Sequence, residues 1–277
     1  MKRQILIALA VLATMTLSSN IAAQEYSWKS TKMDASRTGV TVPAGNNTEK
    51  ALGKVKGRTY YAPNGRVFRR GCIADVARCL MEAQPVMAPV KKVIGHSPAV
   101  MSKHAPESPL SNFAVDVIMK RTAAEAGKKV DCGIINFGGI RVDMPKGDIL
   151  VDDIMSMFPF KNTIVYMEVK GSDLRKVLEW MASTKIQVVG GMKLVIKDRT
   201  LVSAEIGGEP LEDNRTYSLA TISFLLHGGD GLFLGDIAHN LVDYPVDIYD
   251  VIHDYVVAET AAGRDITGSV DGRVVIL

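Results

Sequence analysis

Apolar positions recur at helical spacing in five stretches of the chain, and each pattern predicts a helix. The clearest begins at Ser172, where apolar residues repeat at i, i+3, i+4 and i+7 behind a Gly171-Ser172 cap. Another is expected to run from Ser111, as its N-cap, to Ala126, with Gly127 as its stop. The remaining helices are predicted over residues 73–81, from residue 152 to the proline at 159, and over residues 248–255 with a stop at residue 263.

Shorter apolar or alternating segments predict strands. These segments are residues 130–135, 163–169, 192–196, 217–222 and 274–277, with a hairpin tip over residues 206–211. Strands and helices intermix without a strict βαβ repeat, and no long linker rich in Pro or Ser divides them. We therefore expect one domain that contains both kinds of element and is preceded by an arm.

The first residues have the pattern of a secretory signal peptide. Lys2 and Arg3 precede a short apolar run over residues 5–17, and small residues follow up to Ala23, after which cleavage is expected. The predicted organisation is a signal peptide over residues 1–23, an extended N-terminal arm over residues 24–60 and one domain over residues 61–277. Because no later apolar run is long enough for a transmembrane segment, we expect an exported protein, periplasmic or secreted.

The charge balance argues against a nucleic-acid partner. Removing Lys2 and Arg3 with the leader reduces the 33 basic residues to 31, against 30 acidic residues. A nearly neutral chain without a basic stripe is poorly suited to bind a phosphate backbone.

The chain has three cysteines, Cys72, Cys79 and Cys132, and this odd number rules out a complete set of disulfides. Cys72 and Cys79 are seven residues apart in a predicted helix, which separates them by about 10 Å along the axis and prevents a bridge between them. Since a free cysteine behaves as a small hydrophobic residue, we predict that all three are core thiols.

Candidate chemistry begins at a glycine-rich turn after the predicted strand at residues 130–135. The turn runs from Asn136 to Arg141 and contains Gly138-Gly139, whose backbone N–H groups are open to the close approach of a ligand. Arg141 is placed for a charge-assisted contact with a phosphate or carboxylate. The alternative is a turn in which glycine only satisfies the backbone dihedral angles.

Two aromatic residues lie beside similar bends. Phe160 follows Pro159 at the end of an element, and Phe224 lies shortly before the Gly228-Gly229 pair. Two rings that clamp one heterocycle contribute about 1 to 3 kcal/mol per stacked base. Each ring, taken alone, can equally belong to the hydrophobic core.

Two polar residues complete this set. Asp230 follows the second glycine pair and can accept two hydrogen bonds from sugar hydroxyls, although an Asp beside glycines is also a common turn former. Asn162 can read the edge of a base with its amide, or it can close a turn with its own backbone.

Taken in order, these segments resemble a known family. The agreement in order and spacing is with the C-terminal substrate domain of the 5′-nucleotidase and UDP-sugar hydrolase family, and it is carried by Glu107–Asn112, Asn136–Arg141, Pro159–Asn162, Gln187–Lys193 and Phe224–Gly231. The resemblance covers residues 93–255. It implies an α+β fold, a four-layer α/β/β/α unit that binds a nucleoside or nucleotide.

The resemblance also implies roles for the candidate residues. In it, Phe160 and Phe224 sandwich the base, and Asn162 forms a hydrogen bond near the base. Asp230 binds the ribose hydroxyls, and Arg141 faces the phosphate side. These five positions are therefore expected to surround one ligand.

Two further positions match the family and one departs from it. Asn136 and Gly191 fall on motif positions that shape the floor of the pocket. Family members carry an Arg upstream of the Glu107 segment, whereas this chain has Lys103 and His104 there. The corresponding phosphate contact is therefore in question.

The resemblance does not extend to the family's catalytic half, which is a metallophosphatase. Its two metals are held by Asp-x-His, Asn-His-Asp/Glu and Gly-His-x-His segments. None of the five histidines lies in such a segment: His96, His104, His227, His239 and His253. There is also no Gly-x-Ser-x-Gly nucleophile motif. We expect no cofactor and no metal in this chain, with divalent metals only in a partner metallophosphatase.

Two functions follow as hypotheses. The first is the nucleoside- or nucleotide-recognising half of a split 5′-nucleotidase-like hydrolase of nucleotide catabolism, which works with a separate metallophosphatase chain and is not catalytic alone. The alternative is a nucleoside- or nucleotide-binding module without catalysis. A third possibility, a degenerate structural domain, predicts no binding of such ligands at all.

Overall fold

The computed structural model describes residues 36–41 and 47–277, so the predicted signal peptide and the first part of the predicted arm lie outside the described residues. The chain divides into residues 1–37 and residues 38–277, and all elements named below belong to the second unit. Its helices are α2 (Thr48–Leu52), α3 (Cys72–Met87), α4 (Pro109–Ala126), α5 (Val151–Met157), α6 (Gly171–Ser183) and α7 (Ile248–Ala261). Over the described ranges, no helix combines the length and the apolar composition needed to cross a membrane.

Within the described residues, the strands form two large and two small sheets. The five-stranded sheet has the order β13-β7-β12-β5-β8 and contains β5 (Cys132–Ile135), β7 (Thr163–Lys170), β8 (Val188–Gly190), β12 (Thr216–Ile222) and β13 (His239–Asp247). The four-stranded sheet has the order β11-β10-β9-β14 and contains β9 (Met192–Lys197), β10 (Thr200–Ile206), β11 (Glu209–Pro210) and β14 (Val274–Ile276). The small sheets contain β1 (Lys54–Lys56), β2 (Thr59–Tyr61) and β3 (Val67–Arg69), and β4 (Val93–Ser97) with β6 (Gly147–Leu150).

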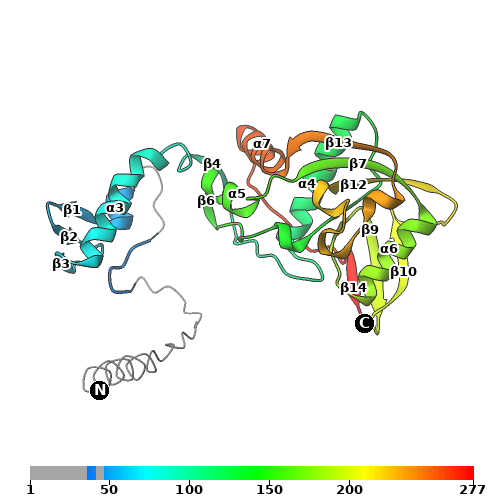
Figure 1. Ribbon diagram of the computed structural model, residues 1–277, viewed down its shortest axis with the longest axis horizontal. Helices are drawn as coiled ribbons and strands as arrows, with labels where there is room; N and C mark the ends of the chain where they lie inside the picture. The colour runs from blue at the N-terminus through cyan, green and yellow to red at the C-terminus, as the bar shows by residue number, and fades with distance from the viewer. Residues whose placement is uncertain (1–35, 42–46) are drawn as a thin grey trace, which may run out of the picture. The chain divides into compact units, whose positions relative to one another are not determined.

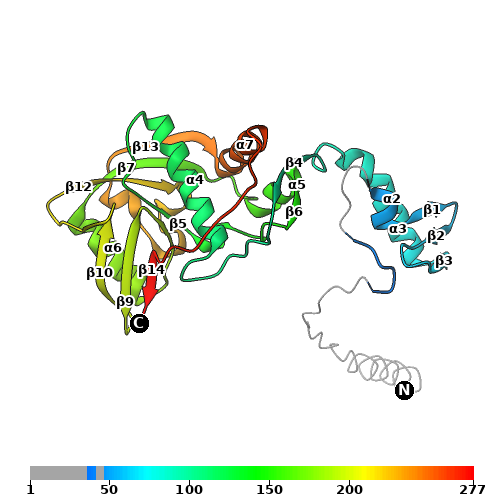
Figure 2. The same cartoon turned by 180° about the vertical axis from the view of Figure 1, so that it is seen from behind.

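Helices cover the two large sheets (Figure 1 and Figure 2). Helix α4 contacts β5, β7, β8 and β12 of the five-stranded sheet, and α6 packs on β10 of the four-stranded sheet. Buried residues from both sheets and from α6, such as Ile134, Leu178, Leu194 and Leu219, belong to one hydrophobic core. Both sheets are mixed, because β5 runs parallel to β12 and β14 runs parallel to β9. The predicted α+β fold is confirmed.

The predicted extended arm is corrected where the structure describes it. Residues 48–60 form α2, β1 and most of β2, so the predicted boundary at residue 60 falls inside a strand. Gly53 (φ 79°) ends α2, and Gly57 (φ 58°) makes the turn between β1 and β2. Tyr60 is buried in one small core with Ala74 of α3, and this contact holds the short elements together.

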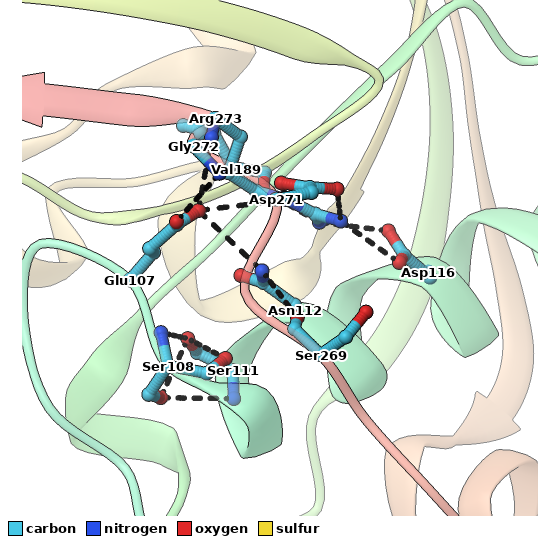
Figure 3. Close-up of polar contacts among 10 residues, drawn as sticks. All are labelled: Glu107, Ser108, Ser111, Asn112, Asp116, Val189, Ser269, Asp271, Gly272 and Arg273. Atoms are coloured by element: carbon cyan, nitrogen blue, oxygen red, sulfur yellow. Dashed lines mark hydrogen bonds and ion pairs between the residues drawn. The ribbon is translucent and has the colours of Figure 1, made fainter.

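Helix α4 begins earlier than the apolar pattern indicates. Ser108, and not Ser111, is the N-cap, and the two serines form a reciprocal capping box (Figure 3). Pro109 occupies the first helical position, where its missing N–H group leaves no hydrogen bond unmade. Gly127 ends the helix in the left-handed conformation (φ 61°), as predicted.

The prediction of three core thiols is wrong for two of them. Cys132 is buried, and this burial raises the pKa of its thiol. Cys72 and Cys79 are exposed on α3. The small three-stranded sheet covers only the side of α3 that carries Ala74 and Ala77, which leaves both thiols at the surface.

The strand that leads to the glycine turn is held at its start by a carboxylate. Asp131 accepts hydrogen bonds from the backbone N–H and the hydroxyl of Ser218 on β12, at 3.0 and 2.8 Å. Burial acts to raise the pKa of Asp131, but the hydrogen bonds from Ser218 and the nearby Lys129 outweigh it and hold the pKa below its ordinary value.

This arrangement predicts a pH-dependent stability. A carboxyl group whose pKa is lower in the folded than in the unfolded state stabilises the fold at pH values above its unfolded-state pKa of about 3.9. This stabilisation is lost as the pH falls through the folded-state pKa. We expect Ser218→Ala to lower the free energy of unfolding by about 1 to 2 kcal/mol at neutral pH, and by clearly less in acid. Urea denaturation at several pH values measures this, with Ser203→Ala on an exposed part of β10 as the control. A loss from Ser218→Ala that is the same at every pH would contradict it.

Candidate functional site

The glycine turn follows β5 directly and forms the 3-10 helix η1 (Phe137–Gly139). A Cβ atom on Gly139 would lie 2.7 Å from Oδ1 of Asn136, so glycine is needed for the Asn136 side chain to fold over the turn. The backbone N–H of Phe137 donates to Oε1 of the fully buried Gln187 at 3.2 Å. The amide of Gln187 therefore holds the turn from inside, and the Asn136 side chain lies over the turn.

Lys103 also stabilises the glycine turn. Its Nζ atom donates to the carbonyl oxygens of Phe137, at 3.2 Å, and Ile140. Burial and, next, the charge of Arg141 lower the pKa of Lys103. Lys103 thus supports the backbone of the turn, and it is not among the residues that line the pocket described below.

A second wall comes from the loop after β12, which contains the 3-10 helices η2 (Ser223–Leu225) and η3 (Gly229–Gly231). A Cβ atom on Gly229 would lie 2.1 Å from the carbonyl oxygen of Phe224 and 2.6 Å from Cδ1 of its ring. Only glycine at this position therefore lets the Phe224 ring lie against the loop. Asp230, between Gly229 and Gly231, adopts a left-handed backbone conformation (φ 49°).

These two walls and the loop between α5 and β7 enclose one pocket of about 280 Å³. Its lining consists of Asn136, Gly138, Gly139, Arg141, Phe160, Asn162, Phe224 and Asp230. Six of the seven residues predicted from the sequence are therefore brought together. Phe160 and Phe224 are 46% and 44% exposed, so neither residue belongs to the core.

The carboxylate of Asp230 is positioned by two donors. Asn136 donates from Nδ2 to Oδ2 of Asp230 at 2.9 Å, and Lys185 approaches Oδ1 with Nζ at 3.2 Å. The Asp230 side chain remains 22% exposed toward the pocket side of this pair. A charged acceptor with a fixed orientation is therefore available to a ligand that carries hydroxyl groups.

The opposite charge comes from Arg141. Its guanidinium carbon lies 5.7 Å from the centroid of the Phe160 ring, and Nη1 donates to the carbonyl oxygen of Gly138 at 3.2 Å. One hydrogen bond leaves most of the guanidinium donors free for an anionic ligand. The side chain of Asn162 makes no hydrogen bond within the described residues, whereas its backbone carbonyl accepts from the N–H of Ile248 at 3.0 Å.

Gly191 does not belong to this pocket, which corrects the sequence prediction. It lines a different hollow together with Lys193, Glu205 and Arg273. Its φ of 67° and the 2.4 Å that would separate a Cβ atom from the carbonyl oxygen of Asp131 explain why glycine occupies this position. Glycine at position 191 therefore allows two segments of the chain to lie close together.

Sequence reasoning missed two residues that support the pocket, Lys185 and Trp180. Lys185 follows α6 in a loop without a recognisable motif, and only the fold brings it to Asp230. Trp180 lies behind Gly231, where a Cβ atom would come within 2.7 Å of the indole ring. Among the residues that the structure describes, no group of three or more His, Cys, Asp or Glu side chains is arranged to hold a metal ion.

Comparison with known proteins identifies the family that this chain resembles. The chain matches the family described as 5′-nucleotidase, C-terminal domain, over residues 88–236, which is more than half of its length. It is 36% identical over 106 residues to protein UshA of Yersinia enterocolitica, covering 36% of this chain and 19% of that protein. It is 28% identical over 217 residues to an apyrase of Tabanus yao, covering 67% of this chain and 38% of the apyrase.

A solved structure agrees with the sequence matches. A 5′-nucleotidase precursor from Thermus thermophilus superposes with a TM-score of 0.64 at 26% identity, over 74% of this chain and 43% of that one. The chain spans less than two fifths of the length of the UshA and apyrase relatives. It belongs to the family of 5′-nucleotidase C-terminal domains.

Proposed function

We propose that this domain recognises a nucleoside or nucleotide in the pocket formed by the glycine turn and the loop after β12. The observation that carries the proposal is the presence of two half-exposed rings, Phe160 and Phe224, in one pocket with a fixed carboxylate and a guanidinium. Few ligands need a flat apolar slot, a hydroxyl acceptor and a phosphate donor together. A nucleotide needs all three.

Each pocket residue has a distinct task in this proposal. The base stacks between Phe160 and Phe224, where each ring contributes about 1 to 3 kcal/mol. Asp230, held by Asn136, accepts hydrogen bonds from the ribose hydroxyls. The free amide of Asn162 is available to the edge of the base, and Arg141 binds the phosphate side.

The domain supplies recognition, and we propose that hydrolysis requires a metallophosphatase partner. The pocket contains no side-chain cluster for metal ions within the described part of the chain. Phosphoester hydrolysis in this family's chemistry relies on metals that activate water and neutralise the leaving group. The activity that we propose is substrate recognition in nucleotide catabolism. Because the sequence has a predicted leader, we propose that the protein acts outside the cytoplasm. A binding module that captures the ligand without any chemistry is the second candidate, supported by the same pocket.

Calorimetric titration of the purified protein tests recognition. We expect heat from adenosine and AMP, less from ribose or inorganic phosphate alone, and competition between adenosine and AMP for one site. No heat from any nucleoside or nucleotide would reject the proposal and favour a structural domain.

Enzyme assays separate the two candidates. The protein alone, with Mn²⁺ or Co²⁺ added, is expected to release no phosphate from AMP, and rapid release would reject the split-enzyme proposal. Adding a metallophosphatase that lacks a substrate domain, from the same organism, should lower the KM of that enzyme for a nucleotide. An unchanged KM and substrate range in the mixture would favour the binding module.

A further inference from the structure

Helix α3 presents a second apolar face, apart from the one that packs on its own sheet. Ala74 and Ala77 are buried against the three-stranded sheet, beside which Figure 2 shows the helix. A different side of α3 carries a line of apolar residues that we call the α3 seam: Cys72, Val76, Cys79, Ala83 and Val86. Val76 is 59% and Val86 is 82% exposed, and both thiols are exposed as well.

The spacing of the α3 seam is that of a helix-pairing surface. Its members follow one another at intervals of four, three, four and three residues. This alternation keeps apolar side chains on one stripe of a helix and is the spacing of the contact positions in a two-stranded coiled coil. Leu80, 46% exposed, lies beside the stripe and lines an apolar hollow together with Cys72, Val76 and the chain's own Val40. A single exposed valine needs no explanation, but five apolar residues along one stripe of a helix do.

The charges next to the α3 seam favour one orientation of a second helix. Asp75 and Glu82 immediately precede Val76 and Ala83 on α3. In a parallel pair of identical helices, they lie opposite Leu80 and Met87 of the second copy, whereas in an antiparallel pair the acidic residues face each other. Only the parallel arrangement avoids this repulsion.

The two thiols point to a second copy of this chain as the occupant. Cys72 and Cys79 are separated by about 10 Å along the helix, so they cannot bridge to each other without breaking it. In a parallel pair, each thiol meets its own counterpart. Helices of radius about 2.3 Å whose axes are 8–10 Å apart bring facing Cα atoms to about 4 to 5 Å, which overlaps the range that a disulfide needs.

We propose that two copies of this protein pair in parallel along the α3 seam and are joined by Cys72–Cys72 and Cys79–Cys79 disulfides. A seam about 21 Å long and about 10 Å wide covers on the order of 400 Å² over both partners, well below the roughly 1,200 Å² of a stable interface. The packing aligns the helices, and the disulfides hold them. Each bridge forms when two thiols pass two electrons and two protons to a small disulfide or a thiol–disulfide oxidoreductase, which becomes a dithiol.

Oxidation of the reduced full-length protein with glutathione disulfide tests this. We expect a dimer on non-reducing gels and in sedimentation, with the two like-to-like bridges identified by mass spectrometry of the peptides. Cys72→Ser combined with Cys79→Ser should leave a monomer under the same conditions.

Matched valine variants separate pairing from random collision. Val76→Glu places a charge in the α3 seam and is expected to slow dimer formation on the order of tenfold. Val202→Glu on β10 is the control, because Val202 is also 59% exposed, and it should form dimers at the wild-type rate. Equal rates in Val76→Glu and wild type, bridges between Cys72 and Cys79, or a monomer that carries only glutathione would each overturn the proposal.

Discussion

Replacing both Phe160 and Phe224 by alanine is expected to weaken adenosine binding by about 2 to 6 kcal/mol, since each stacked ring contributes about 1 to 3 kcal/mol. The single variants should each lose about half of this. Both rings are nearly half exposed, so their removal opens no cavity in the core and should change the free energy of unfolding by less than about 0.5 kcal/mol. Calorimetric titration measures the affinity, and urea denaturation measures the stability.

Tyr61→Ala is the control for the loss of an exposed ring. Tyr61 is 39% exposed on β2 and lies outside the pocket, so this variant should bind adenosine as the wild type does. Wild-type affinity in the Phe160 and Phe224 double variant would show that the rings do not hold the base. A full effect from one ring and none from the other would reduce the sandwich to stacking on a single face.

The helices and inner strands could be predicted because their signals are local. The stop at Gly127 follows from a left-handed residue that glycine tolerates best, and the buried strands β7, β9 and β12 are continuous apolar or alternating runs. Strand β13 gave no such signal. Most of its side chains are exposed, and it is a strand because it pairs with β7 across 70 residues or more of sequence.

The pocket was predictable to the extent that its residues lie at the ends of local elements. Phe160, Asn162 and Phe224 follow or precede bends that can be recognised in the sequence. Their support could not be predicted, because it depends on contacts between distant parts of the chain. Asn136 and Asp230 are 94 residues apart in sequence, and the approach of Lys185 to Asp230 depends on where α6 ends.

The errors over Gly191 and the two cysteines of α3 have a common physical origin. The type of a residue, or its place in a motif, indicates which environments its side chain tolerates. It does not indicate which face of a helix or strand the rest of the fold covers. Helix α3 has apolar residues on more than one side, and the small sheet β1–β3 covers only one. Periodicity alone cannot decide which side is buried.

A buried carboxylate holds the last strand to the rest of the domain (Figure 3). Glu107 is 7% exposed and accepts hydrogen bonds from the backbone N–H groups of Gly272 and Arg273, at 2.8 and 3.0 Å. The guanidinium of Arg273 forms a bidentate pair with Asp116 and a second pair with Asp271. Burial acts to lower the pKa of Arg273, but the hydrogen bonds to Asp271 and Asp116 outweigh it and raise the pKa, so the group stays charged.

Glu107→Gln is therefore expected to lower the free energy of unfolding by about 2 to 3 kcal/mol, although it replaces a single oxygen atom. The amide has one carbonyl oxygen for two backbone donors, and its NH₂ group faces an N–H group that needs an acceptor. Urea denaturation measures the loss. Hydrogen exchange should show β14 (Val274–Ile276) opening first, because the hydrogen bonds from Gly272 and Arg273 hold the segment that enters this edge strand.

The same change at an exposed position isolates this effect. Glu209→Gln on β11 removes a charge from the opposite edge of the four-stranded sheet and should change stability by less than about 0.5 kcal/mol. Equal, small losses in both variants would mean that β14 is held by its pairing with β9 alone. A large loss confined to Glu107→Gln, with early exchange in β14, would show that the segment that begins α4 stabilises the domain by binding the C-terminal segment.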